Sequence, residues 1–87
     1  MSGKLVGEVS HFYKRIGVAV IGLVDVVQIG DQVHFLGRHT DFRQEVISMQ
    51  IEHQSISEAG KGQEIAMKVD QRVRNRDKVF KLIGDDL

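Results

Sequence analysis

The sequence predicts an all-β fold, a small closed antiparallel β-barrel of about six or seven strands. Short segments rich in Val, Ile and aromatic residues recur along the chain, and turn signals separate them at intervals of about 8 to 12 residues. No long amphipathic helical pattern competes with them. A closed barrel is favoured because it hides strand edges, and the chain contains no proline that would blunt an exposed edge.

The extended segments alternate apolar and polar residues as strands do. Lys14 and Arg15 form a polar break between the first two segments, which suits a hairpin. Gly30 and Asp31 indicate a turn, because glycine adopts positive φ readily and aspartate can bond its own backbone. Val46 falls out of phase with the alternation that follows it, so we expect a bulge there. The predicted strands span residues 5–13, 16–24, 32–37, 42–53, 64–69 and 78–83.

The stretch from 54 to 63 combines a helix-like start with glycines. Ser55 and Glu58 have the spacing of a capping box, in which two side chains satisfy early backbone N–H groups of a helix. Gly60 and Gly62 follow so soon that a helix would end after about one turn. We therefore predict a shaped connection between two strands.

Alternation also predicts which side chains fill the barrel. Phe12 and Tyr13 are adjacent in a strand, so they face opposite sides, and the sequence leaves open which of them is buried. We expect a core that includes Val18, Val20, Phe35, Ile65, Met67 and Phe80.

The size and charge of the chain limit its organisation. Its 87 residues suffice for one domain, which we place at residues 4–84, with a C-terminal tail at 85–87. Twelve Lys and Arg balance twelve Asp and Glu, so net charge does not argue for a nucleic-acid partner. The apolar run 16–24 ends at Asp25 and is too short to cross a membrane. The absence of cysteine fits a reducing, cytoplasmic location.

The order of several segments resembles the second domain, a β-barrel, of translational GTPases such as elongation factor Tu and initiation factor two. The resemblance rests on the turn at 29–31 before QVHFLG, on VISMQ, on SEAGKGQEIAMKV, and on a charged turn before KVFK. It covers about residues 5–83 and implies a barrel that contacts ribosomal RNA or helps to hold the end of a charged tRNA. Similar sequences place Glu-Gly-Asp where this chain has residues 75–77, and a positive φ at Arg76 would cost roughly 1 to 2 kcal/mol.

The sequence contains no recognisable catalytic, metal or cofactor motif. The phosphate-binding pattern GxxxxGK followed by Ser or Thr is missing, since the GKG at 60–62 is too short and precedes a glutamate. His39 and Asp41 can meet on one face of a strand, but the histidines have no zinc-like spacing. We predict that the chain alone is not an enzyme and needs no cofactor. The histidines are His11, His34, His39 and His53.

Basic residues are the strongest functional lead. In an extended chain, Arg72, Arg74 and Arg76 would project their guanidinium groups from one side. Arginine binds phosphate bidentately, so such a row suits an RNA backbone. A solvated face with ion pairs to Asp70 and Asp77 is the alternative interpretation. The RNA-binding candidates are Arg72, Arg74, Arg76, Lys78, Lys14, Arg15, Arg38, His39 and Arg43.

Two functions follow as hypotheses. The first is a non-catalytic, translation-factor-like module that binds ribosomal or transfer RNA, or a ribonucleoprotein surface. The second is a protein-interaction or accessory module without RNA binding, whose partner is a translation-related protein or a second copy of the chain. Balanced charge and apolar strands favour this second hypothesis. An enzyme acting alone has the weakest support, because no acid, base, nucleophile or metal set converges.

Overall fold

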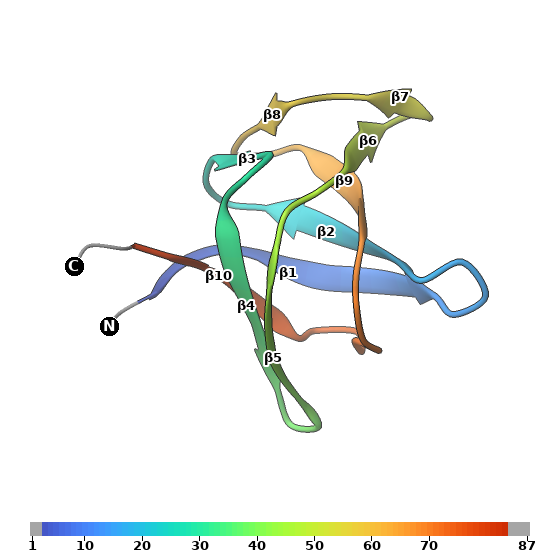
Figure 1. Ribbon diagram of the computed structural model, residues 1–87, viewed down its shortest axis with the longest axis vertical. Helices are drawn as coiled ribbons and strands as arrows, with labels where there is room; N and C mark the ends of the chain where they lie inside the picture. The colour runs from blue at the N-terminus through green and yellow to red at the C-terminus, as the bar shows by residue number, and fades with distance from the viewer. Residues whose placement is uncertain (1–2, 84–87) are drawn as a thin grey trace.

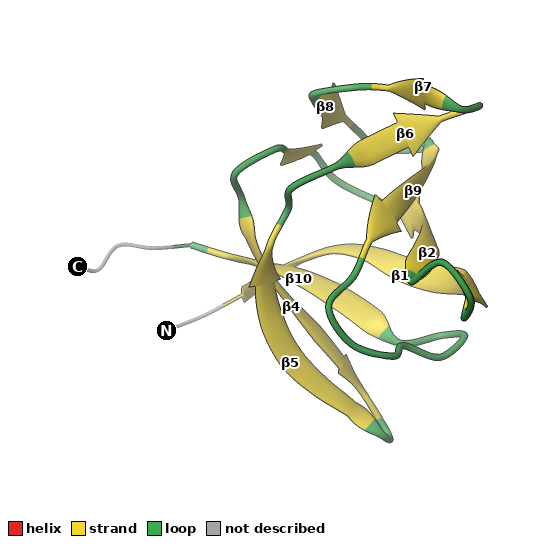
Figure 2. Cartoon of the chain, turned by 45° about the vertical axis from the view of Figure 1, so that its right-hand side comes forward, coloured by secondary structure: helices red, strands yellow, loops and turns green. Residues whose placement is uncertain are grey.

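The computed structural model describes residues 3–83, which form β-strands joined by turns and loops (Figures 1 and 2). The predicted tail at 85–87 lies outside the described residues. Most predicted strands are confirmed with small shifts of their ends, but the single strand predicted over 42–53 is divided. The strands are β1 (Gly3–Tyr13), β2 (Val18–Leu23), β3 (Val27–Gln28), β4 (Gln32–Gly37), β5 (Thr40–Glu45), β6 (Met49–Ile51), β7 (Gln54–Ser55), β8 (Glu58–Ala59), β9 (Glu64–Lys68) and β10 (Lys78–Leu82).

The strands form antiparallel sheets, as predicted, but they do not form the predicted closed barrel. Within residues 3–83, one 8-stranded sheet has the order β5-β4-β10-β1-β2-β9-β6-β7, and a 2-stranded sheet pairs β3 with β8. No ladder joins the two edge strands, β5 and β7, in this part of the chain. β1 lies in the middle of the sheet and shifts register between Leu5 and Gly7 and between Val9 and His11.

The larger sheet is strongly curled, although it is open. β5 lies at one edge and β6 lies next to the other edge, yet only residues 46–48 separate these two strands along the chain. Because an extended chain spans at most about 3.6 Å per residue, the Cα atoms of Glu45 and Met49 lie within about 14 Å of each other. The two edge regions therefore come close together, and the core lies inside the curl.

A side chain bridges the gap between β5 and the end of β9. The Gln44 amide donates from Nε2 to the Lys68 carbonyl at 3.0 Å, and its Oε1 accepts from the Asp70 N–H at 2.7 Å. Gln44 is buried, so these bonds satisfy the donor and acceptor of an amide that is shielded from solvent. The pair of bonds takes the place of one step of a strand ladder.

The main chain at Val46 explains why a break replaces the predicted bulge. The Val46 N–H donates to the Asp31 carbonyl and the Val46 carbonyl accepts from the Gly30 N–H, each at 2.8 Å. Both backbone groups of Val46 are therefore used by the turn between β3 and β4. They are not available for a ladder, so β5 ends at Glu45 and β6 begins at Met49.

The core is one cluster inside the curled sheet, and the predictions of Phe35, Ile65 and Met67 are confirmed. Phe35 and Phe42 oppose each other across β4 and β5 and stack with ring centroids 5.0 Å apart. Phe12 is half-buried and packs against this cluster, whereas Tyr13 is exposed. The two adjacent aromatic side chains thus face opposite sides, as predicted.

The predicted phase of β2 is wrong. Val18 and Val20 are only half-buried and lie on the outer face, while Ala19 and Ile21 fill the core. All residues from 18 to 21 are apolar, so alternation alone does not distinguish the two faces. The pairing of Ile21 with Ile65 of β9 sets the phase that is observed. Phe80, also predicted in the core, is half-buried on β10.

Residues 54–63 form the predicted connection and contain no helix. The Ile56 N–H donates to the Met49 carbonyl at 3.0 Å, and β8 pairs with β3. The spacing of Ser55 and Glu58 therefore does not act as a capping box here. Gly62 has a φ of 89°, which lets the chain turn into β9.

Buried Asp77 holds the turn that leads into β10. Its Oδ2 accepts from the Arg74 N–H at 2.8 Å, and its backbone carbonyl accepts from the Val9 N–H at 2.8 Å. Gly37 lies directly against this carboxylate, because a Cβ added at Gly37 would come 1.9 Å from Asp77 Oδ1. The position of Asp77 therefore requires a residue without a side chain at 37.

Gly37→Ala should lower the free energy of unfolding by about 2 to 4 kcal/mol, because the new methyl group displaces a buried, hydrogen-bonded carboxylate. Urea unfolding followed by circular dichroism measures this change. Gly22→Ala is the matched control, since a Cβ at Gly22 meets nothing within 4 Å. The control should change stability by less than about 1 kcal/mol. Equal stabilities for the two variants would contradict the close contact.

Gln44→Met should destabilise the domain by about 1 to 3 kcal/mol, because it removes both bridging hydrogen bonds at similar side-chain volume. Amide hydrogen exchange gives the local readout, and the Asp70 N–H should exchange faster in this variant. Gln32→Met, on the exposed side of β4, is the control and should leave the Asp70 rate unchanged. An unchanged Asp70 rate in Gln44→Met would show that the bridge does not hold the gap.

Candidate functional site

The arginines at 72, 74 and 76 do not lie on a strand. They are exposed, and Val73 between them is buried, so Arg72 and Arg74 both face solvent. The chain then turns at residues 75–76, where Arg76 has a φ of 77°. A bond of 2.7 Å from the Arg76 N–H to the Val9 carbonyl holds this strained residue. The straight row that an extended chain would form is therefore interrupted by a turn.

The other predicted basic residues lie on separate parts of the molecule. Lys14 and Arg15 occupy the β1–β2 turn, whereas Arg38 and His39 occupy the tip of the β4–β5 hairpin, and these tips point in different directions in Figure 1. Lys78 donates to Glu8 at 2.9 Å. Arg43 is exposed on β5. The structure does not bring the nine candidates together on one surface.

The ionisable pairs of the described residues are isolated, and they range from exposed pairs to the half-buried pair of Lys81 with Asp31, 3.5 Å apart. His34 Nε2 lies 2.6 Å from Asp41 Oδ1, so Asp41 has His34 as its partner and not the predicted His39. The Lys4 ammonium, 2.9 Å from Asp25, is the main cause that holds the pKa of that carboxyl below its usual value. Among residues 3–83 no group of three or more His, Cys, Asp or Glu is placed to hold a metal ion. Nor does this range contain a helix long and apolar enough to span a membrane.

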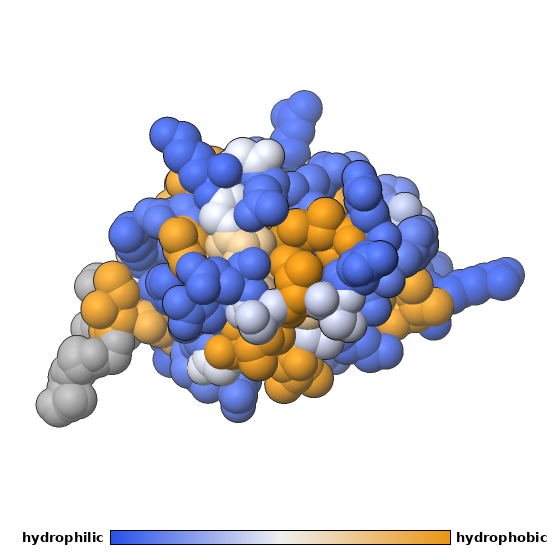
Figure 3. Space-filling view, turned by 90° about the horizontal axis from the view of Figure 1, so that it is seen from above, coloured by the Kyte–Doolittle hydropathy of each residue, from blue (hydrophilic) through white to orange (hydrophobic). Residues whose placement is uncertain are grey.

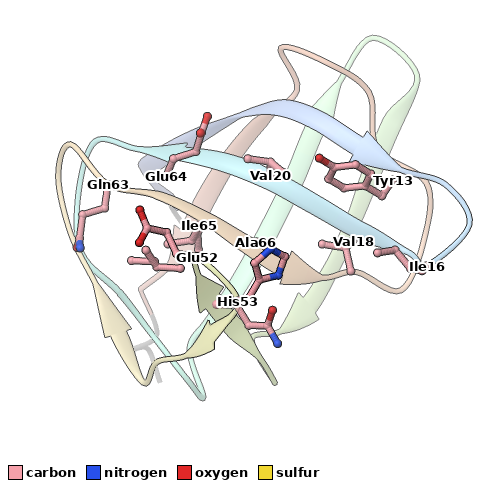
Figure 4. Close-up of a pocket in the computed structure, with 12 residues that line it drawn as sticks. Tyr13, Ile16, Val18, Val20, Glu52, His53, Gln63, Glu64, Ile65 and Ala66 are labelled. Atoms are coloured by element: carbon pink, nitrogen blue, oxygen red, sulfur yellow. The ribbon is translucent and has the colours of Figure 1, made fainter.

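An open groove of about 730 Å³ lies on the outer face of the curled sheet (Figure 4). Its floor is apolar and comes from Val18 and Val20 on β2 and from Ala66 on β9, all half-buried. Val20 opposes Ala66, and Ala66 opposes Gln50 of β6, so one row of side chains crosses three strands. Gly22, the next outward position of β2, adds no side chain to this face.

Two hairpins border the groove. The β6–β7 turn carries Glu52 and His53 over β9, and the β1–β2 hairpin carries Tyr13 and Ile16 at the other side (Figure 4). Both hairpins extend toward the right-hand side of Figure 1. Tyr13 and Ile16 are 50% and 57% exposed, which is high for large apolar side chains beside an apolar floor. The end of the molecule seen in Figure 3 also exposes apolar side chains, with polar ones around them.

The charged residues of the groove are acidic. Glu52 and Glu64 line it, and among the described lining residues there is no Lys or Arg. Ser10 Oγ donates to Glu64 Oε2 at 3.1 Å, which orients this carboxylate but leaves its charge in place. Lys68, beside the groove on β9, donates to the Ile16 carbonyl at 2.9 Å. The groove therefore combines an apolar floor with carboxylates that would repel a phosphate backbone.

The β6–β7 turn is strained. Glu52 and His53 have φ values of 50° and 67°, between Ile51 and Gln54, which pair with each other. A two-residue turn with both φ values positive favours Asn-Gly, because a Cβ crowds the backbone in this region. Each of these residues therefore costs roughly 1 kcal/mol of stability. Two of the three non-glycine residues with positive φ in residues 3–83 line this groove, which suggests that their side chains serve it.

The groove is not predicted from the sequence. The prediction that Glu52 and His53 end one long strand is wrong, since they form a turn. The turn was not predicted because neither residue is the glycine or asparagine that signals such a turn. Val18 and Val20 are also predicted in the core. The continuous apolar run of β2 was a signal that could have indicated the groove. A strand with one solvated face usually alternates apolar and polar residues, so an unbroken apolar run indicates that both faces make apolar contacts.

The chain is similar in sequence to one curated protein and in fold to solved structures. No family model matches the chain. An uncharacterized protease of Methanocaldococcus jannaschii is 38% identical over 78 residues, which cover 88% of this chain and 19% of that protein. The chain thus spans about a fifth of the length of the curated relative that it matches.

Two solved structures share the fold with a TM-score of 0.86 each. Both are crystal structures of the C-terminal domain of a Geobacillus thermoleovorans protein described as a U32 peptidase, and one is a selenomethionine variant. The variant is 21% identical and covers 90% of this chain and 99% of its own. The other is 20% identical and covers 92% of this chain and 93% of its own.

These likenesses overturn the resemblance to the second domain of translational GTPases. That resemblance depended on turn and strand motifs that are individually common in small β-domains. The alignment with a protease extends over nearly the whole chain. The predicted translation-factor module that binds ribosomal or transfer RNA is therefore wrong.

Replacing Glu52 with Asn and His53 with Gly together should stabilise the domain by about 1 to 2 kcal/mol, because both new residues adopt positive φ more easily. For a domain of this size, that gain raises Tm by about 4 to 8 °C per kcal/mol, which calorimetry measures. Lys61→Gly is the control, since Lys61 lies in a turn without positive φ. A double variant no more stable than the natural chain would contradict the assignment of strain.

Proposed function

We propose that this chain is a non-catalytic accessory domain that works as part of a peptidase-type protein. The observation that carries the proposal is the alignment of 88% of the chain with only 19% of an archaeal protease. A domain that occupies a fifth of a larger protein is more readily an accessory unit than its catalytic body. The fold likeness to a C-terminal domain that was crystallised by itself supports the same interpretation.

The geometry of the domain supports a role in binding. Its core is filled by packed aliphatic and aromatic side chains. The pairs of Lys4 with Asp25 and of Lys78 with Glu8 are surface ion pairs of an ordinary kind. The outer groove is the feature that offers shape, apolar surface and charge together. We place the domain in the cytoplasm as part of this proposal, because its sequence has no cysteine and fits a reducing compartment.

A chimera tests the accessory role. This chain replaces the matched 78-residue segment of the archaeal relative, and release of fluorescence from a quenched casein substrate is measured. The isolated chain should release no more fluorescence than its heat-denatured sample. The relative without the segment should lose thermal stability or cleavage of casein. The chimera should regain the thermal stability and casein cleavage of the intact relative.

Two results would contradict the accessory role. Cleavage of casein by the isolated chain, retained through a second purification on a different matrix, would identify it as an enzyme. A truncated relative that matches the intact one in stability and in cleavage would mean that the segment assists nothing. A chimera with Gly37→Ala serves as the control for folding, because it carries the same surface on a destabilised domain.

A further inference from the structure

We propose that the outer groove binds an extended peptide segment with apolar side chains at alternate positions and a lysine or arginine near one end. The apolar side chains lie over Val18, Val20 and Ala66, and the cation pairs with the carboxylates of Glu52 and Glu64. The proposal rests on the groove itself and does not depend on the accessory role within a peptidase-type protein.

The floor matches the period of an extended chain. Val18 and Val20 are two residues apart on β2, so their side chains are about 7 Å apart along the strand. A peptide that runs along β2 presents its own alternate side chains at the same spacing. The row from Val20 to Gln50 spans three strands, or about 10 Å, which is wide enough for one extended chain. The volume of about 730 Å³ lies in the range of known ligand sites.

The charges of the groove select the charge of the peptide. Glu52 and Glu64 have no Lys or Arg beside them in the lining that the structure describes, so a cationic side chain supplies the missing partner. Ser10 already orients Glu64, which reduces the entropy lost when a cation binds. An acidic peptide or a phosphate backbone would meet repulsion at the same place.

Polar side chains around the floor suit a peptide backbone. The amides of Gln50 and Gln63 and the hydroxyl of Tyr13 can donate to peptide carbonyls and accept from peptide N–H groups. The Tyr13 ring contacts His11 edge-on, with centroids 4.4 Å apart, which limits its motion. The groove thus offers both apolar contacts and hydrogen bonds, which a purely apolar ligand would leave unused.

Segments of this chain that combine alternate apolar residues with a lysine or arginine, such as 33–38, 65–69 and 78–82, lie in or next to strands that are paired on both sides. They are therefore not available to fill the groove of a second copy. Residues 78–82, KVFKL, combine lysines with alternate apolar residues. They form β10, which pairs on one side with β1 and on the other with β4. We therefore take the occupant to be a peptide from another protein chain.

Fluorescence anisotropy tests the proposal with an acetylated, labelled octapeptide that has valine at every second position and lysine at one end. The same peptide with glutamate in place of lysine is the charge control. The lysine peptide should bind about three- to tenfold more tightly, and the difference should shrink in 0.5 M salt. The double variant Glu52→Gln, Glu64→Gln should bind the lysine and glutamate peptides with equal affinity. Glu45→Gln, an exposed carboxylate on β5, is the matched variant and should preserve the difference.

Ile16→Ser tests the apolar side of the groove with little risk to folding, because Ile16 is 57% exposed. Ile16→Ser should raise the Kd of both peptides by about two- to fivefold. Leu36 on β4 is 39% exposed, and Leu36→Ser should leave both Kd values unchanged. Equal binding of the lysine and glutamate peptides, or no binding of either at about 1 mM, would overturn the proposal. So would a dimer in analytical ultracentrifugation that Ile16→Ser dissociates, since the groove would then belong to a contact between copies.

Discussion

The structure depends on a curled sheet whose two edges are brought close together by the chain itself. The three residues between β5 and β6 connect opposite sides of the sheet, so the sheet cannot flatten without breaking this link. The Gln44 amide then joins β5 to the end of β9. Curling encloses the apolar side chains on the inner face, which is how a chain of 87 residues without disulfides forms a core.

Local turn chemistry made much of the fold predictable. Gly30 and Asp31 form the predicted turn, with a φ of 97° at Gly30 and a bond of 2.8 Å from the Gln28 N–H to the Asp31 carboxylate. Most strands also lie where alternation predicts them. Closure was not predictable, because it depends on whether the backbone of Val46 joins a ladder or bonds to a distant turn. The sequence around Val46 contains no sign of that choice.

The candidate site was much less predictable than the fold. The groove is assembled from residues near 13–20, 50–53 and 63–66, which are far apart in sequence and meet only through the order of β2, β9 and β6. Basic residues stand out in the sequence because arginines cluster between 72 and 76. In space, the other basic candidates are divided among the β1–β2 turn, the β4–β5 hairpin and the start of β10. Proximity in sequence therefore overstated their common role. Glu52 and Glu64, which line the same groove, are twelve residues apart in sequence and form no cluster there that could be recognised.

Three local features at the groove lower the stability of the domain, and they occur together. Val18 and Val20 keep apolar surface on an outer face, Gly22 contributes no side chain near the end of β2, and Glu52 and His53 hold positive φ. Each of these could arise alone on any small protein. Other turns place glycine at positive φ, as at Gly30 and Gly62, and Arg76 is the exception outside the groove among residues 3–83. Departures from local rules concentrate where a protein meets a ligand, because binding selects surfaces that folding alone would not favour. Their occurrence together at one groove is therefore evidence about its role that no single residue supplies.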